Sequence, residues 1–550
     1  MRKLSLFLLS ALLACVSCRT SSDEKILLLR LRMPNTCTEE GWNAILSGIK
    51  NNPECCNEVW FSTGINVPAM DVHREHVKRL GHAKNDLEKL GIGASVQIQM
   101  TIGHGSACED PAEWTAKTWT GWTGSTGVEH LYCNCPRQPE FLKYLREMTG
   151  IYAALKPRAM WIDDDLRYDN HYPASKDSRP GCWCEKCISD FSAQEGRTWT
   201  RESLDAAMST DPALEERWKV FSLSSLVDIA RIIAEETKAV SPETRMGYQK
   251  TFSYKDTTVV RTILQTLYEV SGEKVSYRPG GGAYYDNLHP AGQIIKSMDA
   301  ARYMKILDCK DIVGSWCPEI ETYPRHYGSR TGQSVLLEGF AALAFGADAI
   351  SMFVLDNGEE SPEVQSRYML HPIHEGSQVL REYARANAGT QAAGYTTGTG
   401  NSELFDLAMT GIPVLQGDGI ELLRLQAEDY KDVDIYAQTS SELQAFRNRL
   451  NEKAPAPVVC DSPFIGMVIP RVDPEGALRT LGLINCRIDA QECIRFLLPS
   501  LPGGIKTVSW RELRNKPVKL RVRQNEKGIP YVEIPRISAW NAGFLLIASS

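Results

Sequence analysis

The sequence lacks the features of three large classes of protein. It has no excess of positive charge, because 61 Lys and Arg residues stand against 68 Asp and Glu residues, which gives a net charge of −7. A nucleic-acid-binding protein or a polybasic membrane-surface protein would carry a basic face, so the composition argues against both classes. No glycine-rich phosphate loop follows the first apolar strand segment, which leaves a dinucleotide-binding fold with little support.

Long hydrophobic runs are also missing beyond the first twenty residues. A basic start precedes an apolar stretch over 4–14, which has the length of a signal peptide and is too short to span a membrane as a mature helix. The stretch ends Leu12-Leu13-Ala14-Cys15, which resembles a bacterial lipobox, and the resemblance implies cleavage before Cys15 and acylation of its sulfur. A plain secretory peptide cut near Ser17 or Cys18 is the alternative, and Cys18 is a second lipidation candidate.

We therefore expect residues 1–24 to be a lipoprotein signal peptide and tether. The mature protein would be a soluble body in the bacterial cell envelope, in the periplasm or at the outer membrane and cell surface. The lipid anchor would be its one attachment to the membrane.

The 550 residues are enough for three or four domains at ~150 residues each. Between residue 25 and about 387, apolar strand segments alternate with amphipathic helical segments. Buried strands that alternate with helices form a parallel sheet, so eight repeats predict a (β/α)8 TIM barrel over 25–387. An open doubly wound sheet is the alternative. The eight predicted strands are 26–31, 58–64, 94–102, 159–165, 245–251, 275–278, 312–316 and 349–355.

The pattern changes after the barrel. Residues 388–460 mix short apolar segments with a helical segment, which indicates a small α/β domain. In 461–550 strand patterns dominate, and Val518, Leu520 and Val522 alternate with charged residues before a turn and a second strand. This alternation is typical of a half-buried antiparallel hairpin, so we expect a C-terminal antiparallel β-sandwich.

Polar side chains follow the ends of the predicted barrel strands, where barrel enzymes carry their chemistry. Asp163-Asp164-Asp165 ends the fourth strand, and Glu319 and Glu321 follow the seventh. Two carboxylates across one pocket suit glycoside hydrolysis, which needs a proton donor and a carboxylate near the anomeric carbon. A separation of ~5–5.5 Å would give retention and ~6.5–9.5 Å inversion. His104, Arg278 and Trp316 at the same ends are candidates for substrate binding.

Aromatic side chains accompany these polar ones and suit the C–H faces of sugar rings. Those near the predicted strand ends are Trp161, Tyr277, Tyr284 and Trp316. A tryptophan-rich stretch with Trp114, Trp119 and Trp122 is either a sugar platform or a packed loop, and we favour the platform.

The sequence contains sixteen cysteines, which could bind a metal ion or form disulfides. Cys182, Cys184 and Cys187 form a C-x-C-x2-C run, and three thiolates that close converge readily on one tetrahedral metal ion. Cys135 and Cys133 lie upstream as candidates for a fourth ligand. A disulfide with a spare thiol is the alternative, although cysteines this close pair poorly on geometry. An exported protein can also form disulfides, for which Cys37, Cys55, Cys56 and Cys108 are candidates.

These motifs resemble glycoside hydrolase family 42, the bacterial β-galactosidases of clan A. The run from Trp161 to Asp165 is similar to the family's W-x-I-D-N-E type motif, and the cysteine run leading to Phe191 is similar to its zinc cluster. Glu319 and Glu321 precede Gly346-Ala347-Asp348 at about the distance between the family's nucleophile and its G-A-D segment. The similar residues are confined to 133–191 and 316–348, whereas the body plan of barrel, α/β domain and β-domain covers most of the chain.

The resemblance implies the roles of individual residues. Asp165 would be the acid/base, Glu319 the nucleophile of a retaining mechanism with Glu321 as its rival, and Asp164 a sugar-hydroxyl ligand. Burial or a nearby carboxylate would have to raise the pKa of the acid. Cys135 would complete a structural four-cysteine zinc site, and catalysis would need no cofactor. The metal ligands implied are Cys135, Cys182, Cys184 and Cys187.

One departure from the family concerns the acid. The family's Asn-Glu pair is Asp164-Asp165 here, and an Asp carboxyl is one methylene shorter than Glu. We therefore expect a divergent relative that cleaves β-glycosidic bonds of an oligosaccharide or polysaccharide. The family trimerises through its α/β domain, so a homo-oligomer is a further expectation, although the matching segment is short. A carbohydrate-binding barrel without catalysis and a metal-dependent hydrolase or deacetylase using Asp163 and Asp165 are the alternatives.

Overall fold

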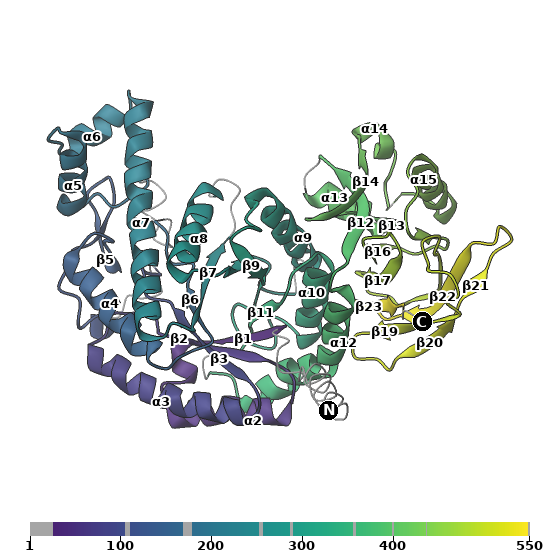
Figure 1. Cartoon of the computed structure of the whole chain (residues 1–550), viewed down its shortest axis with the longest axis horizontal. Coiled ribbons are helices and arrows are strands. Elements are labelled where there is room, and N and C mark those ends of the chain that lie inside the picture. The colour runs from purple at the N-terminus through teal and green to yellow at the C-terminus, as the bar shows by residue number, and fades with distance from the viewer. Residues whose placement is uncertain are drawn as a thin grey trace, which may run out of the picture.

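A computed structural model describes residues 26–104, 111–168, 179–251, 257–286, 290–355, 359–398, 401–435 and 437–547. Within these ranges a helix-covered barrel is followed by a β-rich C-terminal region that packs beside it (Figure 1). No helix in the described ranges is long and apolar enough to cross a membrane. The signal peptide and tether over 1–24, Cys15, Cys18 and Cys108 lie outside the described residues.

The barrel sheet contains nine parallel segments in the order β10-β11-β1-β2-β3-β6-β7-β8-β9. All eight strands predicted from the sequence are present, so the barrel prediction is confirmed and the open-sheet alternative is wrong. The segments are β1 (Leu27–Leu31), β2 (Glu58–Ser62), β3 (Gly93–Ile98), β6 (Ala159–Ile162), β7 (Arg245–Thr251), β8 (Val275–Gly280), β9 (Val313–Trp316), β10 (Glu319–Glu321) and β11 (Ile350–Phe353).

The seventh strand explains why eight strands appear as nine segments. It is interrupted at Cys317 and Pro318, so β9 pairs with β8 on one side and β10 pairs with β11 on the other. The amide of Cys317 donates to the Tyr277 carbonyl (3.0 Å), and the Ser351 amide donates to the Pro318 carbonyl (3.1 Å). Both ends of the sheet order therefore belong to one strand, which closes the barrel.

Helices follow the strands and cover the outside of the barrel (Figure 1). Each buries an apolar face; in α4 this face includes Phe141, Leu145 and Met148, as its helical spacing predicts. The helices are α2 (Glu39–Asn51), α3 (Met70–Lys89), α4 (Pro139–Ala153), α7 (Pro212–Val240), α8 (Thr257–Ser271), α9 (Pro290–Leu307), α10 (Gly332–Ala344) and α12 (His371–Asn387).

Two insertions extend the barrel after its third and fourth strands. The first contains a two-stranded ribbon. The second contains two helices that lie near the end of α7 that points away from the barrel (Figure 1). Together they enclose a small separate core that contains the cysteine cluster. Their elements are η4 (Pro111–Glu113), β4 (Gly121–Thr123), β5 (Glu129–Asn134), α5 (Glu185–Glu195) and α6 (Arg201–Met208). Short elements at other strand ends are η2 (Met33–Asn35), α11 (Pro362–Gln365) and the π-helix η6 (Ser366–Leu370).

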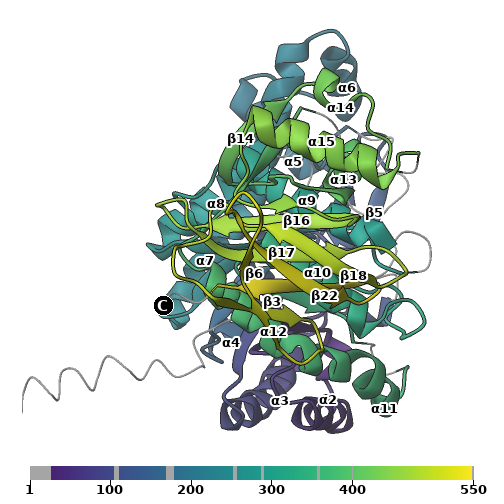
Figure 2. The same ribbon diagram turned by 90° about the vertical axis from the view of Figure 1, so that its right-hand side faces the viewer.

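The C-terminal region, which faces the viewer in Figure 2, consists of a large mixed sheet and a four-stranded antiparallel sheet that share a hydrophobic core. The predicted hairpin forms only next to its turn, where residues 523–524 pair with 530–531; residues 518–521 pair instead with the preceding strand over 507–510. Its strands are β12 (Gln391–Thr397), β13 (Thr410–Pro413), β14 (Gly419–Leu425), β15 (Val459–Cys460), β16 (Gly466–Val472), β17 (Leu478–Asn485), β18 (Gln491–Leu497), β19 (Thr507–Glu512), β20 (Val518–Arg521), β21 (Arg523–Gln524), β22 (Pro530–Ile537) and β23 (Asn541–Leu546). Its helices are α13 (Asn401–Met409), α14 (Ala427–Tyr430) and α15 (Ser440–Lys453).

Strands from both sides of residue 460 share the large sheet. Strand β12 pairs antiparallel with β16, and β13 pairs parallel with the same strand. Helices α10 and α12 of the barrel pack against β17 and β23 of this sheet. The region is thus β-rich and antiparallel in its greater part, as expected, while the separate domain limits at 388–460 and 461–550 stay predictions.

Candidate active site

A buried layer of charged and amide side chains crosses the barrel near the carboxyl ends of its strands. Arg30 ends close to Gln97, whose amide donates to Asp163 Oδ1 (2.8 Å) while its carbonyl accepts from Arg30 Nε (3.1 Å). On the other side, Arg278 donates to the Gln249 amide oxygen (2.9 Å). A glutamine therefore fixes the orientation of each guanidinium group: Gln97, two strands away, holds Arg30, and Gln249, on the adjacent strand, holds Arg278.

Glu319 lies between these two arginines. Its Oε1 accepts a charge-assisted hydrogen bond from Arg30 (2.6 Å) and forms an ion pair with Arg278 (2.8 Å). Burial raises the pKa of Glu319, but the charges of Arg278 and Arg30 outweigh it and hold the pKa below its usual value. The Glu319 carboxylate is therefore ionised at neutral pH.

Gly280 explains how Glu319 can lie so close to strand β8. A side-chain carbon at residue 280 would collide with Cβ of Glu319 and lie 3.2 Å from the Arg278 guanidinium. Only glycine leaves this space open. Strand β8 therefore supplies both the arginine that holds Glu319 and the gap that admits it.

The three aspartates after β6 point to different neighbours. Asp163 points into the buried layer, and its pKa is raised by burial and by Asp164 and Asp165. Asp164 accepts from the Thr251 hydroxyl (2.7 Å) and from Arg167 (3.4 Å). Burial raises the pKa of Asp164, yet Arg167 and Arg278 hold it well below its usual value.

Asp165 is covered by His104. Both of its carboxylate oxygens lie 2.8–3.0 Å from Nδ1 of His104, and the Asp165 side chain has no exposed surface. Burial lowers the pKa of His104, but Asp165 raises it more, to about 9. The pair is therefore an ion pair at neutral pH, in which Asp165 holds the histidine.

Glu321 extends beyond Glu319 along β10. It accepts from Arg325 (2.6 Å), whose guanidinium lies 3.9 Å from the centre of the Phe353 ring. Burial and the charge of Glu319 raise the pKa of Glu321 to about 7. Burial and the charges of Glu319, Glu321 and Asp164 raise the pKa of the Tyr284 phenol.

Exposure separates these acids into two sets. The side chains of Asp164 and Glu321 are 17% and 15% exposed, whereas those of Asp165 and Glu319 are 0% and 5% exposed. The structure therefore brings all the predicted acidic residues to one end of the barrel, with the predicted catalytic pair deeper than its neighbours. Arg278 is fully buried as well, which leaves it no surface for direct contact with a sugar.

One predicted site residue lies elsewhere. Trp316 lines a cavity of about 230 Å³ with Leu28, Ala159 and Arg245, near the amino ends of other strands. The seventh strand continues past Trp316 to Glu321, so Trp316 stands in its middle, and a substrate-binding role for it is not supported. The tryptophan-rich stretch also differs from expectation: Trp114, Trp119 and Trp122 are 1–8% exposed and form a packed loop.

The carboxylate oxygens of the aspartate cluster are close enough together to hold a metal ion. One carboxylate oxygen from each of Asp163, Asp164 and Asp165 lies within 4.8 Å of the others. Arginines and His104 already supply positive charge to these oxygens. We therefore read the cluster as a network of ion pairs.

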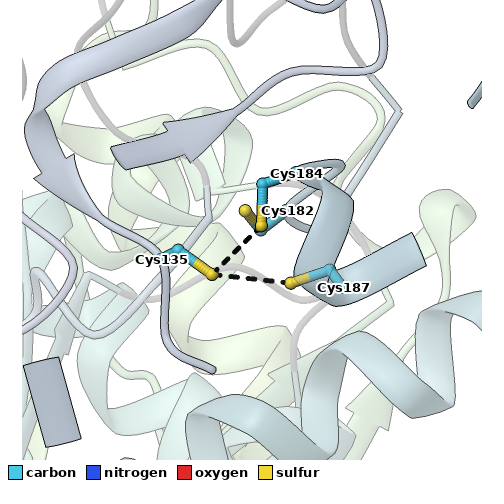
Figure 3. A group of neighbouring side chains, drawn as sticks. All are labelled: Cys135, Cys182, Cys184 and Cys187. Atoms are coloured by element: carbon cyan, nitrogen blue, oxygen red, sulfur yellow. Dashed lines mark hydrogen bonds between the residues drawn. The ribbon is translucent and has the colours of Figure 1, made fainter. Parts of the chain in front are cut away.

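The four cysteines Cys135, Cys182, Cys184 and Cys187 form a compact group (Figure 3), in a small hydrophobic core of its own. Cys135 Sγ lies 3.5 Å from the sulfurs of Cys184 and Cys187, and one sulfur from each of these and Cys182 lies within 4.8 Å of the others. Four thiolates around zinc at about 2.3 Å would stand roughly 3.8 Å apart, so the group fits a closed tetrahedral site. Cys133 is buried nearby but is not a member of this group.

None of these four cysteines is in a disulfide, so the disulfide alternative is wrong for them. Of the other disulfide candidates, Cys37, Cys55 and Cys56 are in no disulfide in the described part of the chain.

Sequence reasoning missed the arginine and the two glutamines that orient the acids. Arg30 had a signal, since it is the one charged residue of the apolar strand LLLRL. Gln97 and Gln249 had none, because each looks like an ordinary polar residue of a strand. Their role depends on contacts with arginines of other strands, Gln97 with Arg30 and Gln249 with Arg278, which the sequence of one strand does not reveal.

The comparisons with known proteins agree on the fold. No protein-family model matches the chain, and no curated protein matches it in sequence. A catalytic mutant of Gan42B, a GH42 β-galactosidase from G. stearothermophilus, is 11% identical over 96% of this chain and 99% of its own, with a TM-score of 0.55. The β-galactosidase from Bacillus circulans sp. alkalophilus is 10% identical over 96% and 100%, with a TM-score of 0.52. At such identities the likeness shows a shared fold: a (β/α)8 barrel followed by a β-rich C-terminal region.

Proposed function

We propose that the protein is a glycoside hydrolase that cleaves β-glycosidic bonds between carboxylates of the fourth and seventh barrel strands. The observation that carries the proposal is the split among the acids at the barrel end: Asp164 is ionised, Glu321 holds its proton near neutral pH, and both are partly exposed. Pairs of carboxyl groups whose environments separate their pKa values are typical of enzymes that use one as an acid and one as a carboxylate. The fold shared with β-galactosidases supports the same class of reaction.

We assign the proton-donor role to Glu321 and the ionised role to Asp164. The donor protonates the leaving oxygen, while the carboxylate stabilises or attacks the anomeric carbon. Asp165 and Glu319, which the sequence favours for these roles, are positioning residues in this proposal. Asp165 holds His104, and Glu319 holds the arginines and raises the pKa of Glu321.

The substrate is an oligosaccharide or polysaccharide, and the reaction needs no metal ion or cofactor. The family resemblance favours a reaction that retains the configuration at the anomeric carbon. Proton NMR of the first anomer released would identify it, because retention and inversion give opposite anomers.

A panel of aryl β-glycosides (galactoside, glucoside, mannoside, fucoside) tests the proposal directly. We expect the mature protein to release the aryl group from at least one member. No release from any member, together with binding of the free sugars, would favour a carbohydrate-binding protein without catalysis. Loss of activity on chelation, with Glu321→Gln still active, would favour a metal-dependent hydrolase or deacetylase.

We also propose that the protein is exported and lipid-anchored at Cys15. The support is the sequence Leu12-Leu13-Ala14-Cys15 after a basic start and a short apolar stretch. Palmitate labelling of the full chain in a bacterial host should mark the wild type and spare Cys15→Ser. Equal labelling of both would point to Cys18.

A further inference from the structure

Exposed tyrosines gather on one part of the barrel surface. Among the described residues, four tyrosines have strongly exposed side chains, namely Tyr285, Tyr323, Tyr327 and Tyr368. All four follow the carboxyl ends of the sixth, seventh or eighth strand. Large exposed aromatic side chains in one place mark a binding surface more often than chance exposure.

The loops that carry these tyrosines contact one another. The Tyr323 amide donates to the Tyr284 carbonyl (3.2 Å), and the Asp286 amide donates to the Ser329 carbonyl (2.8 Å). Tyr327 stacks on Tyr368, with ring centres 4.8 Å apart and planes 21° apart. The rings therefore belong to a single surface built from three successive strand ends.

This surface begins next to the proposed proton donor. Tyr323 is two residues beyond Glu321, and the Arg325 guanidinium that pairs with Glu321 lies 5.8 Å from the centre of the Tyr323 ring. A proton donor acts on the oxygen of the leaving group. Sugar units on the leaving side of the cleaved bond would therefore lie toward these rings.

A cavity with polar lining residues lies next to the segment that carries Tyr368. A cavity of about 410 Å³ opens where the loop after β1 faces α11 and η6, the π-helix that carries Tyr368. Hydroxyl, amide and carboxylate groups line it, and such groups can hydrogen-bond the hydroxyls of a sugar. The polar lining residues include Asn35, Thr38, Glu360, Gln365 and Ser366.

We propose that Tyr323, Tyr327 and Tyr368 form a platform that binds a neutral oligosaccharide chain on the leaving side of the cleaved bond. The natural substrate is then a chain of several sugar units, and an aryl glycoside occupies only part of the site. This inference rests on the proposed function. Tyr327 and Tyr368 each cover one ring face of the other, and the 42–61% exposure of the three residues leaves aromatic surface that sugar C–H groups can contact.

The test compares short and long substrates in matched variants. Cello-, manno-, xylo- and galacto-oligosaccharides of two to six units are used beside the aryl glycosides, with kcat/KM and affinity electrophoresis as readouts. We expect Tyr327→Ala combined with Tyr368→Ala to lower kcat/KM for the longer chains about tenfold or more, which corresponds to about 1.4 kcal/mol. The same variant should leave aryl glycoside hydrolysis within about twofold. Tyr327→Phe should stay near the wild type, because it keeps the ring face.

Tyr531→Ala, in the C-terminal sheet, is the matched control and should change neither substrate class. Equal kcat/KM on long chains in wild type and the double variant would overturn the platform while leaving the hydrolase proposal intact. Loss of chain binding in the double variant of a protein that hydrolyses nothing would support the platform and overturn the hydrolase. The platform would also be contradicted if the wild type bound none of the oligosaccharides. A change in oligomeric state in the double variant would assign the tyrosines to a protein–protein contact.

Discussion

Arg30 and Glu319 are 289 residues apart in the sequence and 2.6 Å apart in the barrel. The contact joins the end of the first strand to the end of the seventh, and Arg278 joins the same carboxylate oxygen from the sixth. Two fixed positive charges thus keep a buried carboxylate ionised next to Glu321. The proton affinity of the proposed donor therefore depends on a contact between distant parts of the chain.

The first prediction concerns this dependence. Glu319→Gln removes a negative charge beside Glu321, so the pKa of Glu321 should fall. Because the donor must hold its proton, activity declines as pH rises through about 7 in the wild type, and this decline should move to lower pH in the variant. The kcat/KM profile between pH 4 and 9 measures the shift. Glu58→Gln, a buried glutamate near the other end of the barrel, should leave the profile unchanged.

Stability should respond as well. Glu319→Gln leaves Arg30 and Arg278 with one carboxylate fewer, and breaking a buried ion pair costs about 3–5 kcal/mol. Urea unfolding measures this loss. A variant with wild-type stability and an unshifted profile would show that Glu319 does not control this end of the barrel.

The second prediction concerns Gly280. A methyl group there would collide with Cβ of Glu319, so Gly280→Ala should displace the carboxylate and lower kcat/KM at least about tenfold. Overpacking of this kind costs about 1–3 kcal/mol of stability. Gly150→Ala is the matched control, since a side chain at this helical position meets no atom within 4 Å. Full activity in Gly280→Ala would mean that the position of Glu319 is not critical.

The third prediction concerns the cysteine cluster. We expect the wild type to bind about one zinc ion per chain. Cys184→Ser should lose this zinc ion, and the segment 179–208 should then become more sensitive to proteolysis. Cys133→Ser should keep the metal, because Cys133 is buried nearby but outside the group of four. Metal content by mass spectrometry and limited proteolysis give the two readouts. Equal zinc loss in both serine variants would place Cys133 among the ligands.

The fourth prediction concerns two buried histidines on α3. His73 and His76 contact the Tyr152 hydroxyl (3.1 and 2.9 Å), and burial lowers the pKa of each from 6.5 to about 4. Both are neutral in the folded protein, whereas the unfolded chain binds protons from about pH 6.5 downward. The free energy of unfolding is therefore not reduced by these histidines above pH 6.5. As pH falls from 6.5 toward 4 it decreases progressively, by up to about 3 kcal/mol per histidine.

Urea unfolding at pH 7.5, 6 and 5 tests this pH dependence. His73→Gln combined with His76→Gln should flatten the dependence, although it lowers stability at pH 7.5. His82→Gln, an exposed histidine on the same helix, should leave the slope unchanged. An equally steep slope in the double variant would assign the acid sensitivity to other groups.

The barrel could be predicted from the sequence because each strand and helix carries its own periodic pattern. The cysteine cluster could be predicted because three of its four members lie within six residues. The acids at the strand ends could be predicted because each follows an apolar strand segment in the sequence. What could not be predicted is which acid is exposed, since Asp164 and Asp165 differ only in whether Thr251 or His104 faces them.

The remaining differences also come from tertiary structure. The break at Cys317 and Pro318 lets the seventh strand run on to Glu321, so Trp316 lies inside the strand and not at its end. The tyrosines of the proposed platform carry no periodic signal, because Tyr323 and Tyr327 lie in one loop and Tyr368 lies in the separate π-helix η6. Their proximity depends on the order of the strands around the closed barrel.

The most direct test of the central claim uses aryl glycosides with good and poor leaving groups. A dinitrophenyl group leaves without protonation, whereas a phenyl group needs the proton donor. We predict that Glu321→Gln loses hydrolysis of the phenyl glycoside by about a hundredfold or more and keeps that of the dinitrophenyl glycoside. Asp164→Asn should lose both. If Glu321→Gln cleaves both at wild-type rates, or if Asp165→Asn shows the leaving-group dependence instead, the assignment of Asp164 and Glu321 is contradicted.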